Sequence, residues 1–477
     1  MTVTIETIPD HPLLEIFSLY VEEARSSSES HIAKRIDAWH TLVHVCQRWR
    51  SLVFASSRRL NLGILCTNTR PLREILDLWP ALPIVIWCEE LSSTEFLPMV
   101  GAENIVSALR HRDHVSQISF LGLPQSVFSR FTAIMHAPFP VLTHLELEPD
   151  EYGDAILQDS FLGGSAPNLR SLRLRGVTSP TLPKLLLSAK DLVDLRLLNF
   201  PFPNYIPPEE MVSCLSSLTK LEDFRLGFPS PASYPDQNRR RLLTRIDLPY
   251  LIRLDFEGTS WYLEDFVAQI NAPLLRDFRI MFIDSVLLNT PQLTDFVDRA
   301  ERFKVLDQAE LDFHYYNVTV YLLSQKETVN RTFLKIQSGC DPSEGHFLAL
   351  AQARSSFLPL ISSLECLNLT EDEYWPIYLQ DSVDNAYWLQ VLRPFTAVKH
   401  LYLSGEPGLH VARALHELTW EGGVEVCPAL QSVFLEGLQP LEDVVEVIGP
   451  FIVRRHLSGH TVTVHSWEGE RLGIDIS

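Results

Sequence analysis

The sequence predicts an α/β fold, in which a small helical segment precedes a curved solenoid of alternating parallel strands and helices. Two observations lead to this prediction. A short phrase of the form L-x-x-L-x-L recurs through most of the 477 residues, with prolines and glycines at fixed distances from it. Residues 1–57 lack the phrase and carry two helix-like apolar patterns instead.

Each copy of the phrase predicts one short strand. Neighbouring clear copies begin about 23 to 34 residues apart, which brackets and exceeds the period of leucine-rich repeats. Weaker copies lie at Val115–Phe120 and Leu311–Phe313, and the register is least legible between 281 and 363. The clear copies begin at Leu142, Leu169, Leu192, Leu221, Leu251, Leu275, Leu364, Val398 and Leu430.

Prolines and glycines mark the two ends of these strands. Proline has no backbone N–H for a strand ladder, so a proline two residues before the first leucine indicates the entry of a strand. Glycine and asparagine tolerate positive φ, so either one just after the last apolar residue indicates a sharp turn. The prolines are Pro140, Pro167, Pro249, Pro273 and Pro428, and the turn residues are Gly122, Gly176, Asn199, Gly258, Gly405 and Gly437.

Helices are predicted between the strands, for example over 207–218, 261–270 and 290–303. Ser260 and Thr290, just before or at the start of the last two, are acceptable N-caps. Each strand–helix unit needs its neighbours to bury its leucines, so the units should share one continuous core.

The solenoid is expected to cover residues 58–437. A strand–helix–strand pattern from Leu60 to Trp87 indicates that it starts early, with PLREILDLW from Pro71 as the helix. A helix over Leu441–Val453 and a strand from His460 predict a C-terminal cap at 438–477.

Residues 1–57 predict two helices, over Pro12–Arg25 and Ala33–Phe54. The second helix has more apolar positions than one packing partner needs, with Leu42, Cys46 and Trp49 on one stripe. A unit of this size buries little surface alone. Either all these side chains close the first turns of the solenoid as a cap, or some of them bind another protein.

IPDHPLLEIFSLY from Ile8, followed by LVHVCQRWRSLVF from Leu42, resembles the F-box. The F-box pattern is Leu-Pro, a first helix rich in Leu, Ile and Phe, and then Val-Cys-x-x-Trp. Ile8 stands for the usual leucine, and the SSSES loop from Ser26 lengthens the segment. With degenerate repeats and a terminal TVTV-type strand, the whole layout is similar to the large fungal class of F-box proteins.

The resemblance implies a non-catalytic substrate receptor of an SCF ubiquitin ligase. The F-box would bind a Skp-type adaptor and through it a cullin, while the repeats hold a protein substrate. Such a receptor raises the effective concentration of target lysines near a ubiquitin-conjugating enzyme. By position, the adaptor contacts would be Pro9, Leu13, Ile16, Phe17, Val45, Cys46 and Trp49.

The substrate surface is expected on the concave face, where the residues between the inward leucines point. Arginines form a basic run on this face of an otherwise acidic chain. We hypothesise that they receive an acidic or phosphorylated segment, because guanidinium groups match carboxylate and phosphate oxygens. The tentative substrate contacts are Arg173, Arg175, Arg196 and Arg225, with Tyr402 and Phe434 as a second, aromatic patch.

A different interpretation of the same arginines is open. Asp194, Asp223 and Asp277 each stand two residues before an arginine. Charges of opposite sign on neighbouring strands stabilise one another. The columns would then neutralise themselves and bind no ligand.

Composition excludes several function classes. Forty Lys and Arg against 60 Asp and Glu give a net charge of −20, which argues against nucleic-acid binding. The seven cysteines never form a CxxC pair, which indicates reduced, buried thiols. No metal site, cofactor motif, catalytic motif, signal peptide or membrane span is expected, and the protein is expected to be intracellular, cytoplasmic or nuclear.

Two alternatives compete with the receptor. The chain could be a leucine-rich-repeat interaction scaffold whose F-box-like segment is only a structural cap. The chain could also be an enzyme whose site is assembled by folding, although an open curved surface offers no deep polar pocket. Binding of the adaptor separates the first two.

Overall fold

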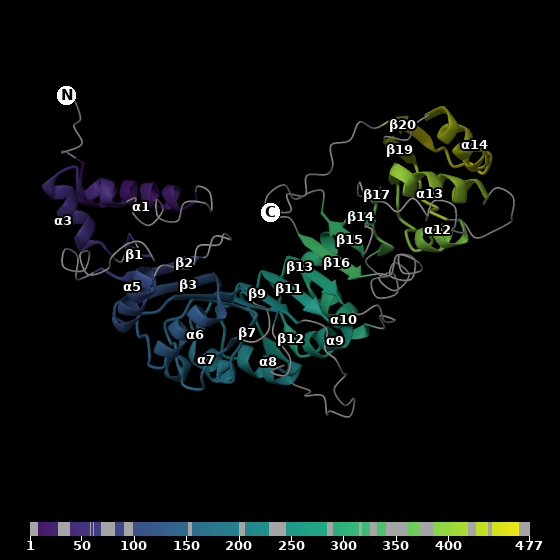
Figure 1. The fold of residues 1–477 in the computed structure, drawn as a ribbon. Coiled ribbons are helices and arrows are strands. Elements are labelled where there is room, and N and C mark those ends of the chain that lie inside the picture. The colour runs from purple at the N-terminus through teal and green to yellow at the C-terminus, as the bar shows by residue number, and fades with distance from the viewer. Residues whose placement is uncertain are drawn as a thin grey trace, which may run out of the picture. The chain divides into compact units, whose positions relative to one another are not determined.

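The nine clear copies of the phrase each form one strand of a mainly parallel sheet, with helices returning the chain between strands (Figure 1). The α/β solenoid class predicted from the sequence is confirmed. The computed structural model describes residues 8–26, 39–57, 59–60, 62–67, 82–89, 99–150, 155–199, 206–228, 245–283, 290–313, 317–324, 332–339, 361–371, 385–417, 426–436 and 441–466. The helix expected at 71–79 lies outside these residues.

The chain divides into two units, Met1–Tyr205 and Ile206–Ser477. In the first unit the strand order is β1-β2-β3-β4-β6-β8, all pairs parallel, and Figure 1 shows α6 and α7 on one side of this sheet. Its elements are α1 (Asp10–Ser26), α3 (Gln47–Ala55), β1 (Ile64–Cys66), β2 (Ile84–Glu89), α5 (Met99–Arg110), β3 (Val115–Leu123), α6 (Gln125–Ile134), β4 (His144–Pro149), β5 (Ala155–Ile156), a 3-10 turn (Phe161–Gly164), β6 (Ser171–Arg175), β7 (Val177–Thr178), α7 (Leu182–Ser188) and β8 (Asp194–Leu198).

In the second unit the order is β9-β11-β13-β16-β15-β14-β17-β18-β19-β20. Its elements are α8 (Pro208–Leu215), β9 (Asp223–Gly227), β10 (Ile246–Asp247), β11 (Arg253–Gly258), α9 (Ser260–Val267), β12 (Ile270–Asn271), β13 (Asp277–Phe282), α10 (Pro291–Arg299), a 3-10 turn (Glu301–Val305), β14 (Gln308–Phe313), β15 (Asn317–Leu323), β16 (Phe333–Gly339), β17 (Cys366–Glu371), α12 (Asn385–Leu392), β18 (His400–Ser404), α13 (Gly405–Glu417), β19 (Ser432–Glu436), α14 (Leu441–Leu457) and β20 (Thr463–Ser466). The boundaries expected after residues 57 and 437 stay predictions.

The five prolines lie in a tight turn that precedes the strand, and not at the first residue of the strand as the sequence indicated. The amide of Leu142 donates to the carbonyl of Phe139, 3.2 Å away, so Pro140 is the second residue of a β-turn. Its fixed φ suits that position. The same hydrogen bond encloses the proline in four more repeats: Ala166 to Leu169, Leu248 to Leu251, Ala272 to Leu275, and Cys427 to Leu430.

Positive φ is confirmed at four of the predicted turn residues, although Gly122 lies inside β3, where the register with β4 shifts, and not after the strand. The φ angles are 62° at Gly122, 63° at Gly176, 51° at Asn199 and 61° at Gly405. Gly258 was expected to join them and does not. A Cβ there would lie 2.8 Å from Cζ of Phe256, so glycine leaves room for that ring. Gly437 lies outside the described residues.

Residues 308–339 interrupt the parallel order with an antiparallel insertion. β14 pairs antiparallel with β15, and β15 pairs antiparallel with β16. β16 then lies beside β13 and β14 beside β17, both in parallel. This meander explains why the repeat register is illegible in that part of the sequence.

The inward leucines form the core of both units. Leu145, Leu172 and Leu195, on adjacent strands of the first unit, are at most 1% exposed. Leu254, Phe278 and Leu334, on adjacent strands of the second unit, are also at most 1% exposed. At about 25 cal/mol per Å², each such side chain contributes roughly 1.5–3 kcal/mol when fully buried.

The helix α10 is capped by a neighbouring helix, contrary to expectation. The side chain of Thr290 makes no capping hydrogen bond, and Ser260 is the first residue of α9 and not its cap. Instead, the buried carboxylate of Glu264, on α9, accepts from the amides of Gln292 at 3.0 Å and Leu293 at 2.8 Å. The repeats are thus joined through their helices as well as through the sheet.

Candidate partner-binding surfaces

Within the described residues, the helix expected over Ala33–Phe54 is interrupted. Helical residues 39–43 end before Cys46, and α3 begins at Gln47. Cys46 has extended backbone, and its Sγ accepts from the amide of Trp49 at 3.5 Å, so it is an N-cap. Cys46 is exposed and not part of a buried stripe, which corrects two expectations for this thiol.

A small core holds this segment together. Leu13 and Phe17 are at most 1% exposed, and the Phe17 ring lies 4.7 Å from the half-buried ring of Trp49. Arg48 ties α3 to the start of α1, because Nη2 donates to the carbonyl of Ile8 and to Oδ1 of Asp10, both at 2.6 Å. Three of the seven candidate adaptor contacts, Leu13, Phe17 and Trp49, therefore pack within the segment.

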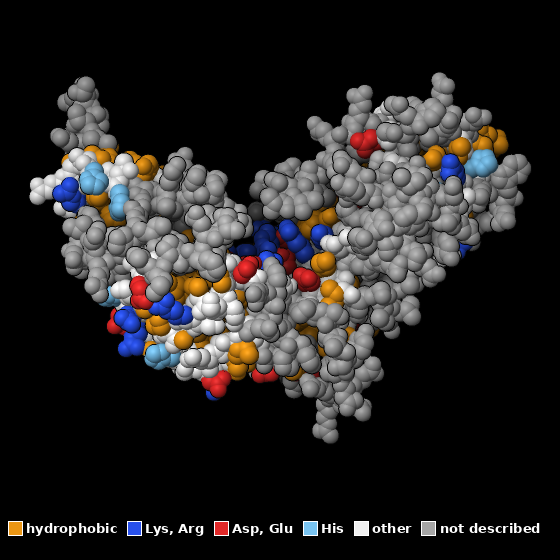
Figure 2. Space-filling view, in the orientation of Figure 1, with side chains coloured by type: hydrophobic (Ala, Val, Ile, Leu, Met, Phe, Trp, Pro, Cys, Tyr) orange, Lys and Arg blue, Asp and Glu red, His pale blue; other side chains and the backbone are white. Residues whose placement is uncertain are grey.

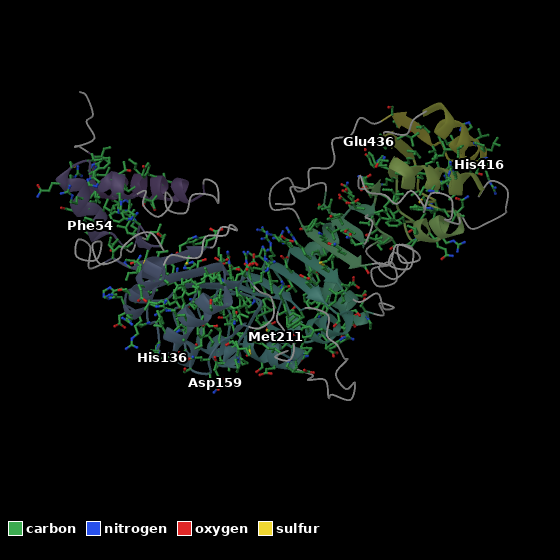
Figure 3. All side chains as sticks on the ribbon, viewed as in Figure 1. Phe54, His136, Asp159, Met211, His416 and Glu436 are labelled. Carbon is green, nitrogen blue, oxygen red and sulfur yellow. The ribbon has the colours of Figure 1, made fainter. Side chains whose placement is uncertain are left out.

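Part of the segment is fixed to the solenoid. The buried Trp39 donates from Nε1 to the carbonyl of Gly63, 3.2 Å away, just before β1. Its ring also packs edge-on against Phe54, which Figure 3 labels within α3, with the centroids 5.9 Å apart. This contact supports the cap interpretation for one part of the apolar surface.

The other candidate contacts face solvent. Ile16 is 50% exposed and Val45 54%, and Pro9 and Cys46 are exposed as well. Leu19 and Tyr20 join them, and they follow Ile16 by three and four residues on the same face of α1. Figure 2 shows hydrophobic side chains at the surface of this segment. Helical periodicity alone could have added Leu19 and Tyr20 to the predicted surface.

The basic run of the first unit is held by carboxylates. Arg173 lies 2.8 Å from Asp194 and 3.6 Å from Glu146, and Asp194 also lies 3.0 Å from Arg196. Burial alone would raise the pKa of Asp194, but Arg173 and Arg196 outweigh it and hold the pKa below its ordinary value. Arg175 pairs with Glu148 at 3.2 Å.

The second unit continues the pattern as a checkerboard. Arg225 lies 3.3 Å from Asp223 and 3.2 Å from Asp255, and Arg253 lies 2.7 Å from Asp277. Figure 2 shows these two kinds of charge mixed over the strands labelled β11 and β13 in Figure 1. The self-neutralising arrangement is therefore present, and a ligand at the four predicted arginines would have to compete with their carboxylates.

The predicted aromatic patch is a stack of rings. Tyr402 and Phe434 lie on adjacent strands, 4.4 Å apart and 9° from parallel. His465, on β20, extends the stack at 5.1 Å from Phe434. Tyr402 and Phe434 are half-buried, so this row offers ring edges to a partner while its faces stack on one another.

A metal ion needs several ligating side chains in one place. No group of three His, Cys, Asp or Glu side chains among the described residues could hold such an ion. Of the cysteines in the described ranges, Cys66, Cys88, Cys214 and Cys427 are buried, and burial raises the pKa of the Cys66 and Cys427 thiols to about 12. No described helix is long and apolar enough to cross a membrane.

Comparison with known proteins adds little to this geometry. No protein-family model and no curated protein matches the sequence. Among solved structures, the leucine-rich repeat-containing protein LegL7 from Legionella pneumophila is similar at 10% identity, with a TM-score of 0.28, over 86% of this chain and 93% of that one. So low a TM-score carries no argument about function, and the repeat fold described above is established by the strands and leucines of this chain.

Proposed function

We propose that this protein is a substrate-recognition subunit of an SCF-type ubiquitin ligase. In this proposal the N-terminal segment binds a Skp-type adaptor and through it a cullin, and the repeat surface holds a protein substrate. The protein performs no catalysis and acts inside the cell, in the cytoplasm or the nucleus.

One observation carries the proposal. The N-terminal segment closes its own core with Leu13 and Phe17, and it still exposes the apolar side chains of Ile16, Leu19 and Val45. A contiguous patch of exposed apolar side chains on a folded segment is typical of an interaction site. The resemblance to the F-box accounts for that surface.

The test is adaptor binding by the purified full-length chain, measured by isothermal titration with a purified Skp adaptor. The variant Ile16→Asp combined with Val45→Asp places two charges on exposed positions and should leave the fold intact. We expect it to abolish binding, while Ile156→Asp, at a 66% exposed apolar position of β5, leaves binding unchanged.

The alternative is a repeat scaffold whose helical segment is only a cap, and the buried contact of Trp39 with Gly63 favours it. That function predicts no adaptor binding by the unmodified chain. Binding that survives the double substitution would also contradict the receptor proposal.

A further inference from the structure

The charge pattern of the second unit changes where the antiparallel insertion meets the parallel repeats. In register across the strands lie Asp255 of β11, Arg279 of β13, Lys335 of β16, Tyr321 of β15 and Glu310 of β14. Arg279 and Lys335 are direct neighbours in this row. Like charges directly opposite one another are destabilising, so the checkerboard breaks at this point.

Lys335 differs from the arginines of the same face. Each arginine described above has a carboxylate within 4.0 Å, Arg279 included, which lies 3.1 Å from Asp277. Within the described ranges the Lys335 ammonium makes no ion pair and no hydrogen bond. Its contact is with the face of the Tyr321 ring, whose centroid lies 5.6 Å from Nζ.

The surroundings of Lys335 disfavour its charge. Burial and the neighbouring Arg279 both lower the pKa of the ammonium below its ordinary value, while Asp255 and Asp312 act more weakly in the opposite direction. An anion placed between the two cations would remove this penalty, because opposite charges favour the ionised form.

Two aromatic rings frame the pair. The guanidinium carbon of Arg279 lies 5.5 Å from the centroid of the Phe333 ring, as Lys335 lies over Tyr321. Stacking on a ring face leaves N–H groups at the edge of a guanidinium free to donate. Arg279 also donates from Nε and Nη2 to Asp277, at 3.1 and 3.3 Å, so Nη1 is the nitrogen that it keeps for a ligand. The Lys335 ammonium keeps its donors.

We propose that Lys335 and Arg279 bind a phosphoryl group carried by a segment of the protein substrate. A phosphoryl group has a charge of about −1.5 to −2 at pH 7 and three acceptor oxygens, so it matches two cations, whereas a carboxylate matches one. The identity of the ligand as a substrate segment rests on the proposed function; the anion site itself does not.

This site replaces the predicted basic run as the place for an anion. Arg173, Arg196 and Arg225 are engaged by carboxylates, so a ligand gains little by displacing them. The Lys335 site needs no displacement at the lysine. The sequence could not show it, because the pairing of β13 with β16 skips two intervening strands.

The test measures binding of a fluorescein-labelled Gly-Gly-phosphoserine-Gly-Gly peptide to the full-length chain by fluorescence anisotropy, beside the same peptide with serine or aspartate. We expect the phosphopeptide to bind most tightly. Lys335→Gln should weaken it by about tenfold, which corresponds to the loss of one charge-assisted hydrogen bond. Lys335→Arg, which keeps the charge, should retain binding.

Lys399→Gln is the matched control. Lys399 stands just before β18 of the same sheet and is paired with Glu365 at 2.8 Å, so its loss should not alter phosphopeptide binding. Equal affinity of unmodified chain and Lys335→Gln, no phosphopeptide binding at all, or equal binding of the aspartate peptide would each overturn the site. The assay contains no adaptor, so such a failure would not contradict the receptor proposal. In the same way, a failure to bind the adaptor would not contradict the anion site.

Discussion

The N-terminal helical segment and the repeats use similar apolar patterns to different ends. In the repeats, the inward leucines of successive strands are almost completely buried, as Leu172 and Leu195 show at 0% exposure. On α1, Leu13 and Phe17 are buried equally well, yet Leu19 is 66% exposed on the opposite face. The repeats thus bury their inward leucines against one another, whereas the N-terminal segment leaves some apolar side chains exposed. An amphipathic pattern therefore identifies a helix, but only burial shows which of its faces is spare.

The largest expected effect separates the two faces of α1. Phe17→Ala should lower the free energy of unfolding by about 3–5 kcal/mol, because it empties a buried site beside Trp49. Ile16→Ala, at a half-exposed position, should change it by less than about 0.5 kcal/mol. Denaturant unfolding followed by tryptophan fluorescence measures both. If the two substitutions lowered the free energy of unfolding by similar amounts, Ile16 would also contribute to the core, and α1 would have no exposed apolar face.

A medium effect tests how the repeats depend on one another. Glu264→Ala should cost about 1–3 kcal/mol, because the buried amide of Leu293 and the part-buried amide of Gln292 lose their acceptor. Glu264→Gln keeps an acceptor oxygen and should cost less. Hydrogen exchange at Gln292 and Leu293 should speed up in the alanine variant. If exchange there is unchanged, the cap contributes nothing and the repeats are joined through the sheet alone.

The smallest effect concerns the charged columns. The pKa of Asp194 is lowered in the folded chain, so its ion pairs stabilise the fold above its ordinary pKa of 3.8 and lose that contribution as the pH falls through the folded value. Arg173 is 38% exposed, and solvent screening should keep the contribution below about 1 kcal/mol. Asp194→Asn should therefore lower stability slightly at pH 7, and the difference should shrink below pH 3.8. A difference that is the same at pH 2.5 as at pH 7 would contradict this.

Local rules accounted for most of the fold. Each of the nine clear copies of the leucine phrase forms a strand. Prolines marked the start of five of these strands, and glycine or asparagine marked the end of several. The exceptions have physical causes. The helix predicted over Ala33–Phe54 is interrupted before Cys46, whose extended backbone and thiol cap the start of α3. Gly258 stands where Phe256 leaves no room for a side chain, and its φ is not positive.

The candidate surfaces could be predicted only in part. The pattern of α1 identified Ile16 and Phe17 alike, although one is exposed and the other buried, because residue type does not tell which side a neighbour covers. The arginine column was visible as a column, but distances were needed to show that Asp194 holds two of its members. The role of Lys335 could not be predicted from the sequence, because its neighbours come from strands that pair out of sequence order.

The antiparallel insertion also affects how the second unit can fold. A parallel repeat array can grow by adding each strand to the one before it in sequence. β13 cannot be extended in this way, because its neighbour in the sheet is β16, which follows β14 and β15 along the chain. β17 in turn pairs with β14, across more than 50 residues (Gln308 with Cys366). Contacts on either side of the three-stranded meander are therefore local, whereas those across it have a high sequence separation and are expected to form more slowly.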